Sequence, residues 1–322
     1  MLLLGLQGSP RKKGNTNFLL SAFMREAEQL GAQTIVIDVD KKNIVPCREY
    51  TVCEKNGFCP IKDDMKTEIY SLLRQADIVV MASPVFFYNV TAQLKALIDR
   101  CQTLWARKYK LRLTDPGRHM RRGFMLAAGA TKGKNLFEGL HLTAKYFFDA
   151  VGAAYEGSLT YSGIEHPGDM ERHPTVHRDI GNAVENLVRP FLERKKILFA
   201  CRENACRSQM AGAFAQHIGG DKIEALTAGS TPADKVNPLM ARVMAEKGID
   251  MAFRVPKSIE TAIQSIRPDM IITMGCGEKC PIVPDAEPRD WDLPDPGGKD
   301  IEFMRGVRDE IEKQVTELVS EL

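Results

Sequence analysis

The strongest constraint on the fold is an alternation of apolar and helix-patterned segments that runs through the sequence twice. In the first series, apolar segments at 2–7, 34–39, 77–85 and 124–130 are separated by helical patterns at 17–30, 65–75 and 90–101. In the second series, apolar segments at 195–201, 223–230 and 269–275 precede a closing helical pattern. Strands that alternate with helices usually pair in parallel. The sequence therefore predicts an α/β fold with two domains, each a parallel sheet flanked by helices.

The boundary between the two domains is expected near residue 192. The chain has 322 residues, whereas one domain ordinarily has roughly 100–200 residues. The segment "NLVRPFLERKK" at 186–196 combines Pro190 with a run of charges directly before the second series begins. We therefore expect one domain over 1–191 and another over 192–322.

The closing helical pattern carries one apolar stripe. Its residues recur at steps of three and four, as on one face of a helix. They are Met304, Val307, Ile311, Val315, Leu318 and Leu322. We expect this stripe to face the core of the second domain and not a partner.

Composition limits the class of protein. No apolar stretch approaches the ~20 residues that span a bilayer, and the amino terminus lacks the basic leader of a signal peptide. The formal net charge is +2, and no basic segment is interleaved with aromatic residues as in a nucleic-acid module. The expectation is a cytoplasmic protein that binds neither membrane nor nucleic acid. Its eight cysteines then indicate metal binding or thiol chemistry more than a disulfide framework.

The segment "CRENACRS" at 201–208 lies between an apolar strand pattern and a helical pattern. Backbone N–H groups of such a loop, together with the positive end of the helix dipole, favour a bound oxyanion. The same field favours a nucleophilic thiolate at Cys201, while Arg207 can grip two oxygens and Ser208 can donate to the thiolate. The residues expected to bind the oxyanion are Arg202, Glu203, Asn204, Ala205, Cys206 and Arg207.

From 195 to 322 the sequence resembles the low-molecular-weight tyrosine phosphatase fold, and specifically its arsenate reductase branch. The resemblance implies that Asp295, in "DLPDP", protonates the leaving oxygen. It also implies that Cys201 forms an adduct with arsenate, that Cys276 attacks this adduct and releases arsenite, and that Cys280 then forms a disulfide with Cys276. External thioredoxin or a small thiol would reduce that disulfide.

Three features depart from this resemblance. Only three residues separate Cys276 from Cys280, which is shorter than in many thioredoxin-coupled relatives, and the pair could alternatively be half of a zinc site. Ala205 stands where the family often has serine. Cys206 has two interpretations, a redox participant or a small buried residue, and the second is favoured.

The segment "GSPRKKGNTN" at 8–17 also follows a strand pattern and opens a helix, so its amides and side chains suit a phosphate. The segment "ASPVFFYNV" at 82–90 adds an apolar, aromatic ledge fit for a flat ring. Together with "AAGATKG" at 127–133, these segments resemble the NADPH-dependent FMN reductase and iron–sulfur flavoprotein group, which has a flavodoxin-like fold. The resemblance covers about 1–185. Tyr88 occupies a place where that group often has glycine, and it would crowd the ring or stack on it.

The resemblance implies bound FMN, with NADPH or NADH as reductant. The FMN phosphate would lie on residues 9–17 and the ring along 83–89. The residues assigned to the cofactor are Ser9, Arg11, Asn15, Thr16, Asn17, Ser83, Pro84, Val85, Phe86, Phe87 and Asn89.

The segment "PCREYTVCEKNGFC" at 46–59 is also typical of that group, some members of which bind a four-iron cluster through four cysteines. Here only Cys47, Cys53 and Cys59 are present, and Tyr50 stands where a fourth thiol would be needed. Three thiolates do not complete a four-cysteine site. An iron–sulfur cluster is therefore not expected, and Cys101 is interpreted as a core residue.

The leading interpretation is an arsenate reductase fused to a flavin-dependent NAD(P)H oxidoreductase. Reduced FMN would recharge the Cys276–Cys280 disulfide directly, or thioredoxin or a small thiol would do so. One alternative is a protein-tyrosine phosphatase whose extra cysteines protect the nucleophile by reversible oxidation. Another is a non-catalytic redox or oxyanion sensor. A homodimer is expected from the flavodoxin-like resemblance.

Overall fold

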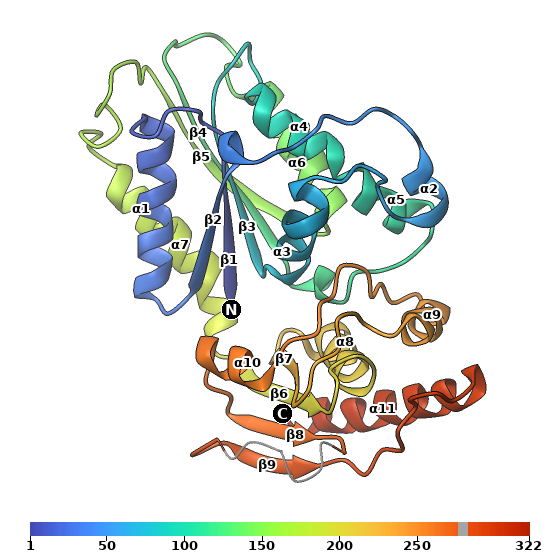
Figure 1. Cartoon of the computed structure of the whole chain (residues 1–322). Helices are drawn as coiled ribbons and strands as arrows, with labels where there is room; N and C mark the ends of the chain where they lie inside the picture. Colours follow the sequence, from blue (N-terminus) through green and yellow to red (C-terminus); the bar gives the residue numbers. More distant parts are fainter. Residues whose placement is uncertain (276–282) are drawn as a thin grey trace. The chain divides into compact units, whose positions relative to one another are not determined.

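The computed structural model describes residues 1–275 and 283–322. Its chain divides into two compact units (Figure 1). Unit 1 comprises Met1–Arg112 and His119–Leu192, and unit 2 comprises Leu113–Arg118 and Glu193–Leu322. Among the described residues, no helix is both long enough and apolar enough to cross a membrane.

Unit 1 is built on a five-stranded parallel sheet in the order β2-β1-β3-β4-β5. The strands are β1 (Leu2–Gln7), β2 (Gln33–Asp38), β3 (Ile78–Pro84), β4 (Arg122–Gly129) and β5 (Ala154–Ser162). This is the order of a flavodoxin-like doubly wound sheet, in which ligands bind beyond the carboxyl ends of the strands. The central strands β1 and β3 are almost entirely buried, which explains their continuous apolar sequence.

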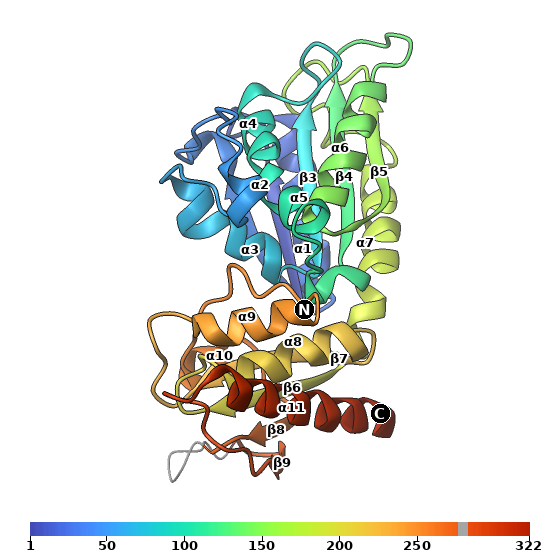
Figure 2. The ribbon, with the colours of Figure 1, turned by 90° about the vertical axis from the view of Figure 1, so that its right-hand side faces the viewer.

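Helices cover both faces of this sheet (Figures 1 and 2). The helices α1 (Asn15–Gln29) and α7 (Val176–Leu192) pack together on one face, over a core that includes Phe23 and Phe191. The other face carries α3 (Tyr70–Gln75), which continues a π-helical turn at Met65–Ile69, together with α4 (Ala92–Arg100), α5 (Gln102–Tyr109) and α6 (Glu138–Val151). The short α2 (Val52–Asn56) lies in the cysteine-containing segment.

Helix α7 continues through Pro190 and ends at Leu192. Proline has no N–H, so the carbonyl of Asn186, four residues earlier, loses its helical donor. Arg122 Nη1 donates to that carbonyl at 3.4 Å, and its guanidinium lies 5.5 Å from the ring centroid of Phe191. One arginine from β4 therefore compensates for the proline and allows the helix to extend to the end of unit 1.

Unit 2 has a four-stranded parallel sheet in the order β7-β6-β8-β9. The strands are β6 (Lys195–Cys201), β7 (Ile223–Gly229), β8 (Met270–Thr273) and β9 (Glu287–Asp290), and the helices are α8 (Arg207–Gly219), α9 (Pro238–Glu246), α10 (Ile259–Ser265) and α11 (Ile301–Glu321). One core, under α8, α9 and α11, includes Phe199 and Phe214. A smaller core, which includes Leu198 and Ala262, lies between the other face and α10.

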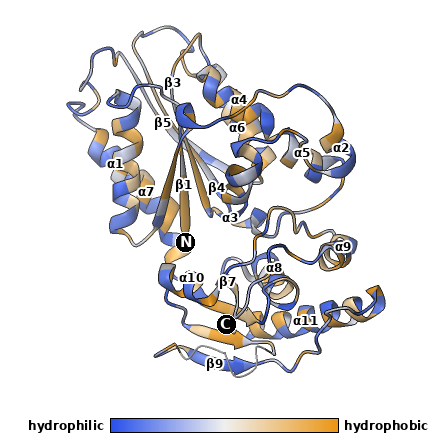
Figure 3. Cartoon of the chain, viewed as in Figure 1, coloured by the Kyte–Doolittle hydropathy of each residue, from blue (hydrophilic) through white to orange (hydrophobic). Residues whose placement is uncertain are grey.

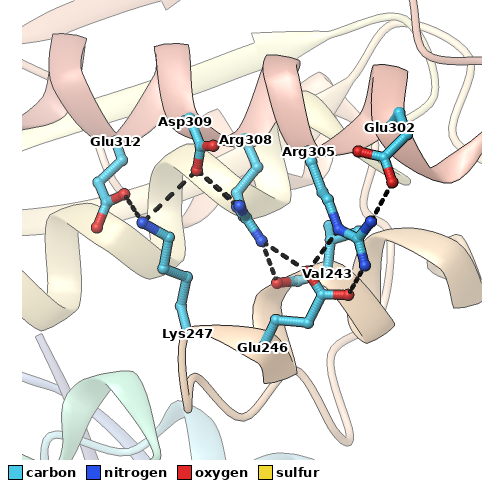
Figure 4. A network of polar contacts seen from close by, with 8 residues as sticks. All are labelled: Val243, Glu246, Lys247, Glu302, Arg305, Arg308, Asp309 and Glu312. Carbon is cyan, nitrogen blue, oxygen red and sulfur yellow. Dashed lines mark hydrogen bonds and ion pairs between the residues drawn. The ribbon is translucent and has the colours of Figure 1, made fainter.

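A polar network joins α9 to α11 on the surface of unit 2 (Figure 4). Glu246 accepts hydrogen bonds from Arg305 at 2.6 and 2.9 Å, and from Arg308 at 3.1 Å. Arg308 also donates to the carbonyl of Val243 at 2.9 Å, and Lys247 pairs with Glu312 at 2.8 Å. Because several charges share partners, this network fixes the two helices better than isolated surface pairs would.

The predicted fold class is confirmed, since both sheets are parallel and flanked by helices. Five residues of the apolar stripe on α11, from Met304 to Leu318, are buried as expected. The prediction is wrong for the sixth residue, Leu322, which lies beyond the helix and is 40% exposed. The edge strands β5 and β9 were not expected. Figure 3 shows why for β9, which is hydrophilic whereas β1 is mostly hydrophobic.

Candidate functional sites

The loop between β6 and α8 in unit 2 turns its backbone amides inward. The carbonyls of Cys201, Arg202, Glu203 and Ala205 accept hydrogen bonds from the amides of Ser230, Thr231, Ala233 and Asn237, at 2.8–3.1 Å. In each peptide group the N–H points opposite to the carbonyl. The amides of residues 202, 203, 204 and 206 therefore point to the inside of the loop, as a cradle for an anion requires.

Two backbone positions make this loop possible. Asn204 has φ of 51°, a left-handed conformation that asparagine tolerates better than most residues. Gly229, at the end of β7, passes so close that a Cβ there would lie 2.7 Å from the carbonyl oxygen of Arg202 and 2.8 Å from the nitrogen of Asn204. The neighbouring strand therefore supports the cradle only if this position has no side chain.

Cys201 lies at the bottom of the cradle and is 3% exposed. Its Sγ accepts from the amide of Asn204 at 3.3 Å and lies 3.0 Å from Ser208 Oγ. Donors aimed at a sulfur stabilise its thiolate form. The arrangement can thus present a buried nucleophile to an anion held by the loop.

Arg207 enters the site from the first turn of α8. Its side chain is 7% exposed, and its Nη1 donates to the carbonyl of Leu293 at 3.1 Å. Its Nη2 lies 3.4 Å from Asp295 Oδ1. Gly275 also passes close, because a Cβ there would be 2.8 Å from Arg207 Nη1. The structure therefore brings Asp295 to the same site as the cysteine loop, although they are far apart in sequence.

Other residues assigned to this site are placed differently. Arg202 and Glu203 have exposed side chains, so only their backbone faces the cradle. Cys206 is partly buried, and burial, followed by the charges of Cys201 and Asp295, raises its pKa to about 12. A thiol that stays protonated is a poor nucleophile, which fits the interpretation of Cys206 as a small, partly buried residue. Cys276 and Cys280 lie outside the described residues.

In unit 1 the loop between β1 and α1 forms the second candidate site. Helix α1 begins after Gly14, and no side chain of the described residues caps it. Ser9 and Thr16 are buried at 6% and 4% exposure, while Arg11 is exposed. Asn17 is half-buried. An uncapped helix terminus flanked by hydroxyls is suited to a phosphate group.

The side-chain amide of Asn15 is hydrogen-bonded to the segment that follows β5 and not directed at the loop. Its Nδ2 donates to the carbonyl of His166 at 2.9 Å, and its Oδ1 accepts from the amide of Met170 at 3.2 Å. Its side chain therefore holds the segment after β5 against the start of α1.

Gln7 is a residue of this site that the sequence interpretation missed. It ends β1, is 3% exposed, and accepts from the amide of Ser9 through Oε1 at 3.2 Å. Its buried Nε2 has no hydrogen-bond partner among the residues that the structure describes. An unmade buried hydrogen bond is costly, so a donor left over beside the loop supports the fit of an anionic group there.

The turn between β3 and α4 presents aromatic side chains. Phe86 and Asn89 exchange backbone hydrogen bonds at 2.8 and 2.9 Å, and the two residues between them, Phe87 and Tyr88, have φ of 47° and 60°. This is the geometry of a type I′ turn, which ordinarily needs glycine or asparagine. The positive φ of Tyr88 explains why proteins of the resembled family often have glycine at this place. Phe87 is fully exposed, at 103%.

The remaining residues assigned to the ring build this turn. Ser83 is buried, donates to the carbonyl of Pro84 and accepts from the amide of Thr91. Val85 donates its amide to the carbonyl of Ala128 at 3.1 Å. Asn89 Oδ1 accepts from Thr143 at 3.0 Å. These hydrogen bonds hold the backbone of the turn, while Phe86, Phe87 and Tyr88 stay exposed.

A cavity of about 550 Å³ lies beside this turn. Its lining consists of Lys132, Gly133, Asn135, Leu136, Phe137, Glu138, His141 and Ser162. Tyr88 adjoins it, because a Cβ at Gly133 would be 2.6 Å from the Tyr88 hydroxyl. The volume lies in the range of small-molecule sites.

The cysteine-containing segment of unit 1 is held at both ends by buried arginines. Arg100 pairs with Asp63 and donates to the carbonyl of Val45 at 2.6 Å. Arg107 donates to the carbonyl of Gly57 at 3.1 Å. Within the described residues, however, no three His, Cys, Asp or Glu side chains are grouped to hold a metal ion. Three thiols do not supply the four-thiolate set of a cluster, and Cys101 is fully buried, with a pKa raised by burial to about 12.

Comparisons with known proteins match the two parts of the chain to two different families. The sequence profile of NADPH-dependent FMN reductases matches residues 1–141. That of low molecular weight phosphotyrosine protein phosphatases matches residues 196–322. An iron–sulfur flavoprotein of Archaeoglobus fulgidus is 42% identical over 108 residues, which are 34% of this chain and 54% of that protein. The chain thus spans about half the length of the iron–sulfur flavoproteins that it matches.

The second half matches arsenate reductases over nearly their whole length. A putative arsenate reductase of Halobacterium salinarum is 39% identical over 132 residues, which are 39% of this chain and 92% of that protein. A glutaredoxin arsenate reductase of Synechocystis is 35% identical over 131 residues, which are 40% of this chain and 98% of that protein. The chain therefore joins a domain of the NADPH-dependent FMN reductase and iron–sulfur flavoprotein family to a domain of the low molecular weight phosphotyrosine phosphatase and arsenate reductase family.

Proposed function

We propose that the second domain reduces arsenate to arsenite through Cys201. The observation that carries this proposal is the buried sulfur of Cys201 at the bottom of a loop whose amides point inward, with Arg207 beside it. Arsenate is a tetrahedral oxyanion, so inward amides and a planar guanidinium suit its oxygens. The names of the arsenate reductase relatives support the same substrate.

The proposed reaction begins when the Cys201 thiolate attacks arsenic. One arsenate oxygen then leaves as water, with a proton supplied by Asp295. Cys276 attacks the sulfur of Cys201, so that a Cys201–Cys276 disulfide forms, the sulfur–arsenic bond breaks, and its electron pair remains on arsenic as arsenite. Arsenic thereby gains the two electrons that the two thiols lose. Cys280 then attacks Cys276, releases Cys201 and leaves the Cys276–Cys280 disulfide.

Multiple-turnover assays test this proposal. With dithiothreitol or glutathione plus glutaredoxin as reductant, the wild-type protein is expected to produce arsenite continuously. Cys276→Ser and Cys280→Ser should turn over much more slowly, because only the external thiol can then resolve the Cys201 adduct or the Cys201–Cys276 disulfide, while Cys201→Ser produces none. Unchanged turnover in Cys276→Ser would refute the relay but leave Cys201 as the nucleophile.

A phosphatase is the second candidate, because the same cradle suits phosphate and because the carboxylate of Asp295, the proposed acid, lies 3.4 Å from Arg207 Nη2. A phosphatase needs water and not electrons to complete its cycle. Cleavage of para-nitrophenyl phosphate that survives both Cys276→Ser and Cys280→Ser, together with no arsenite formation, would favour it. A non-catalytic sensor would bind phosphate or arsenate and turn over neither.

For the first domain we propose binding of FMN and oxidation of NADPH or NADH. The uncapped start of α1, the hydroxyls of Ser9 and Thr16, and the unused donor of Gln7 would hold the phosphate, and the turn at 83–89 would border the ring. When bound, FMN accepts hydride from a nicotinamide and passes the electrons on singly or in pairs. Flavin fluorescence tests this assignment: FMN should bind at least tenfold more tightly than riboflavin, which lacks the phosphate. Equal affinities for FMN and riboflavin would contradict a phosphate site at the start of α1.

The electron donor for the Cys276–Cys280 disulfide is a separate question. We propose that reduced FMN supplies it, because fusion raises the effective concentration of one domain around the other. Anaerobic arsenite production with NADPH as the sole reductant would support this route. Production that requires added glutaredoxin or thioredoxin would refute it and assign an external dithiol, in keeping with the name of the Synechocystis relative.

The iron–sulfur cluster and the oligomeric state remain predictions. With three cysteines in the segment at 46–59, we expect protein purified without oxygen to contain no stoichiometric iron or acid-labile sulfide. Two irons or more per chain would contradict this. Light scattering coupled to size exclusion is expected to report a homodimer.

A further inference from the structure

A chain of buried amides leads from Arg254 to the sulfur of Cys201 in unit 2. Arg254 Nη1 donates to Gln209 Oε1 at 3.5 Å, and Gln209 Nε2 donates to Asn204 Oδ1 at 3.1 Å. Asn204 Nδ2 donates to Ser208 Oγ at 2.8 Å, and Ser208 Oγ lies 3.0 Å from Cys201 Sγ. Asn204, Gln209 and Ser208 are all at most 1% exposed.

The direction of each hydrogen bond in this chain follows from its outer end. Arginine has donors only. The amide of Gln209 must therefore turn its oxygen to Arg254 and its nitrogen to Asn204. Asn204 must in turn present its oxygen to Gln209 and its nitrogen to Ser208.

A second donor fixes Asn204 in the same orientation. The backbone amide of Lys257 donates to Asn204 Oδ1 at 2.9 Å. If the side-chain amide of Asn204 were reversed, its NH₂ would face two other donors and its oxygen would face Ser208. That oxygen would then compete with Cys201 for the hydroxyl proton of Ser208.

With Asn204 donating to Ser208 Oγ, the hydroxyl hydrogen of Ser208 is available for the sulfur. A hydrogen bond donated to a thiolate stabilises the charged form relative to the neutral thiol. Orientation of a remote amide can therefore determine whether the Ser208 hydroxyl points at the Cys201 sulfur.

We propose that Gln209 is a positioning residue for the nucleophile, which acts through Asn204 and Ser208 to direct the Ser208 hydroxyl at Cys201. The inference rests on the proposed role of Cys201 as the nucleophile. Gln209 touches neither the sulfur nor an anion in the cradle, and it follows directly after the motif "CRENACRS". The spacing of residues in the sequence does not indicate a function for Gln209.

The test measures the alkylation rate of Cys201 by iodoacetamide as a function of pH. Trypsin cleaves after Lys196 and Arg202, and the peptide 197–202 contains Cys201 as its single cysteine. Mass spectrometry can therefore follow this thiol separately from the other seven. No arsenate is needed, so the result does not depend on reductase activity.

In Gln209→Met, which keeps the volume but removes both hydrogen bonds, the pH midpoint of alkylation should rise by about 0.5–1 unit, as for loss of one buried hydrogen bond. Arg254→Met should raise it by a smaller amount. The matched control is Gln216→Met on the same helix, since Gln216 also accepts from Arg254 but is not among the hydrogen-bond partners of Asn204 in the described residues. Its midpoint should be unchanged.

A double-mutant cycle separates positioning from general loosening of the loop. Ser208→Ala removes the last donor and should raise the midpoint most. In that background Gln209→Met should add nothing further, because its effect passes through Ser208. An equal shift with and without Ser208 would overturn the proposal, as would unchanged midpoints in both Gln209→Met and Arg254→Met when circular dichroism shows the variants folded.

The outcome is distinct from that of the proposed function. Protein that shows the predicted shifts but reduces no arsenate would keep the positioning role and refute the reductase. Arsenate reduction with no shift in Gln209→Met would do the reverse.

Discussion

Asp295 Oδ1 lies 3.4 Å from Arg207 Nη2, although 88 positions separate the two residues in the sequence. Arg207 is nearly buried whereas the Asp295 side chain is 68% exposed. The carboxylate therefore occupies the outer side of the cradle and faces the guanidinium that would hold an oxyanion. Oxyanion binding is proposed for Arg207 and proton transfer for Asp295, and substitutions can test the two roles separately.

Asp295→Asn should separate proton transfer from binding. Loss of a general acid lowers turnover by about 10²–10⁴-fold, so kcat for arsenate should fall by at least 10²-fold. Removal of a negative charge next to the cradle should leave phosphate affinity equal or tighter. Steady-state kinetics and calorimetric titration with phosphate measure the two effects. Weaker phosphate binding with normal kcat would contradict the assignment.

Gly229→Ala should disrupt the cradle from the neighbouring strand. The new Cβ would meet two backbone atoms at 2.7 and 2.8 Å, and backbone cannot swing aside as a side chain can. We expect a loss of about 1–3 kcal/mol in unfolding free energy and at least tenfold weaker phosphate binding. Gly306→Ala is the control, because its Cβ would meet no atom within 4 Å in the middle of α11. It should stabilise the domain by up to about 1 kcal/mol and leave phosphate binding unchanged.

Asn204 combines a left-handed backbone with a buried side chain, and two substitutions divide these contributions. Asn204→Ala loses the hydrogen bonds and keeps a Cβ at φ of 51° without the polar side chain that helps asparagine to adopt this conformation. Asn204→Gly loses the same hydrogen bonds without the conformational strain. Urea unfolding should therefore find Asn204→Ala the more destabilised, by roughly 1 kcal/mol. Equal stabilities would show that strain at this position is negligible.

The α9–α11 network should make stability depend on pH in the acid range. Hydrogen bonding from Arg305, helped by the charges of Arg305 and Arg308, lowers the pKa of Glu246 from 4.5 to about 2. A carboxylate with a depressed folded-state pKa contributes stability above its unfolded value and loses it as the pH falls from 4.5 toward 2. Glu246→Gln should therefore lower Tm at pH 6 and flatten its decline below pH 4.5. Glu317→Gln, on α11 but outside the contacts of Figure 4, should leave the profile unchanged.

The sequence predicts the central strands of both sheets because those strands are buried on both faces and so are continuously apolar. The edge strands β5 and β9 give no such signal. β5 is half-buried along most of its length, and β9 reads "EPRD", with charges and a proline that suit an edge. At Pro190 in α7, Arg122 from another element donates to the carbonyl that lost its helical donor, and no local pattern shows this.

At the site, the local motif predicts that Cys201, Arg207 and Ser208 lie together, since strand, loop and helix fix their spacing. The roles of Gly229 and Gln209 could not be predicted from spacing, because they depend on contacts between segments that meet only in the folded domain. Asn15 was assigned to a phosphate on the same local reasoning, yet its amide is used by residues 166 and 170. Long-range hydrogen bonds are the part of a site that sequence patterns do not encode visibly.

We propose that arsenic receives its two electrons through Cys201. The most direct measurement is a single turnover: fully reduced protein, freed of external thiol and flavin reductant, is mixed with arsenate, and arsenite and remaining thiols are quantified. We expect one arsenite per chain with the loss of two thiols, and none in Cys201→Ser. Arsenite formation that persists in Cys201→Ser, or wild-type protein that binds phosphate in the cradle yet converts no arsenate, would contradict it.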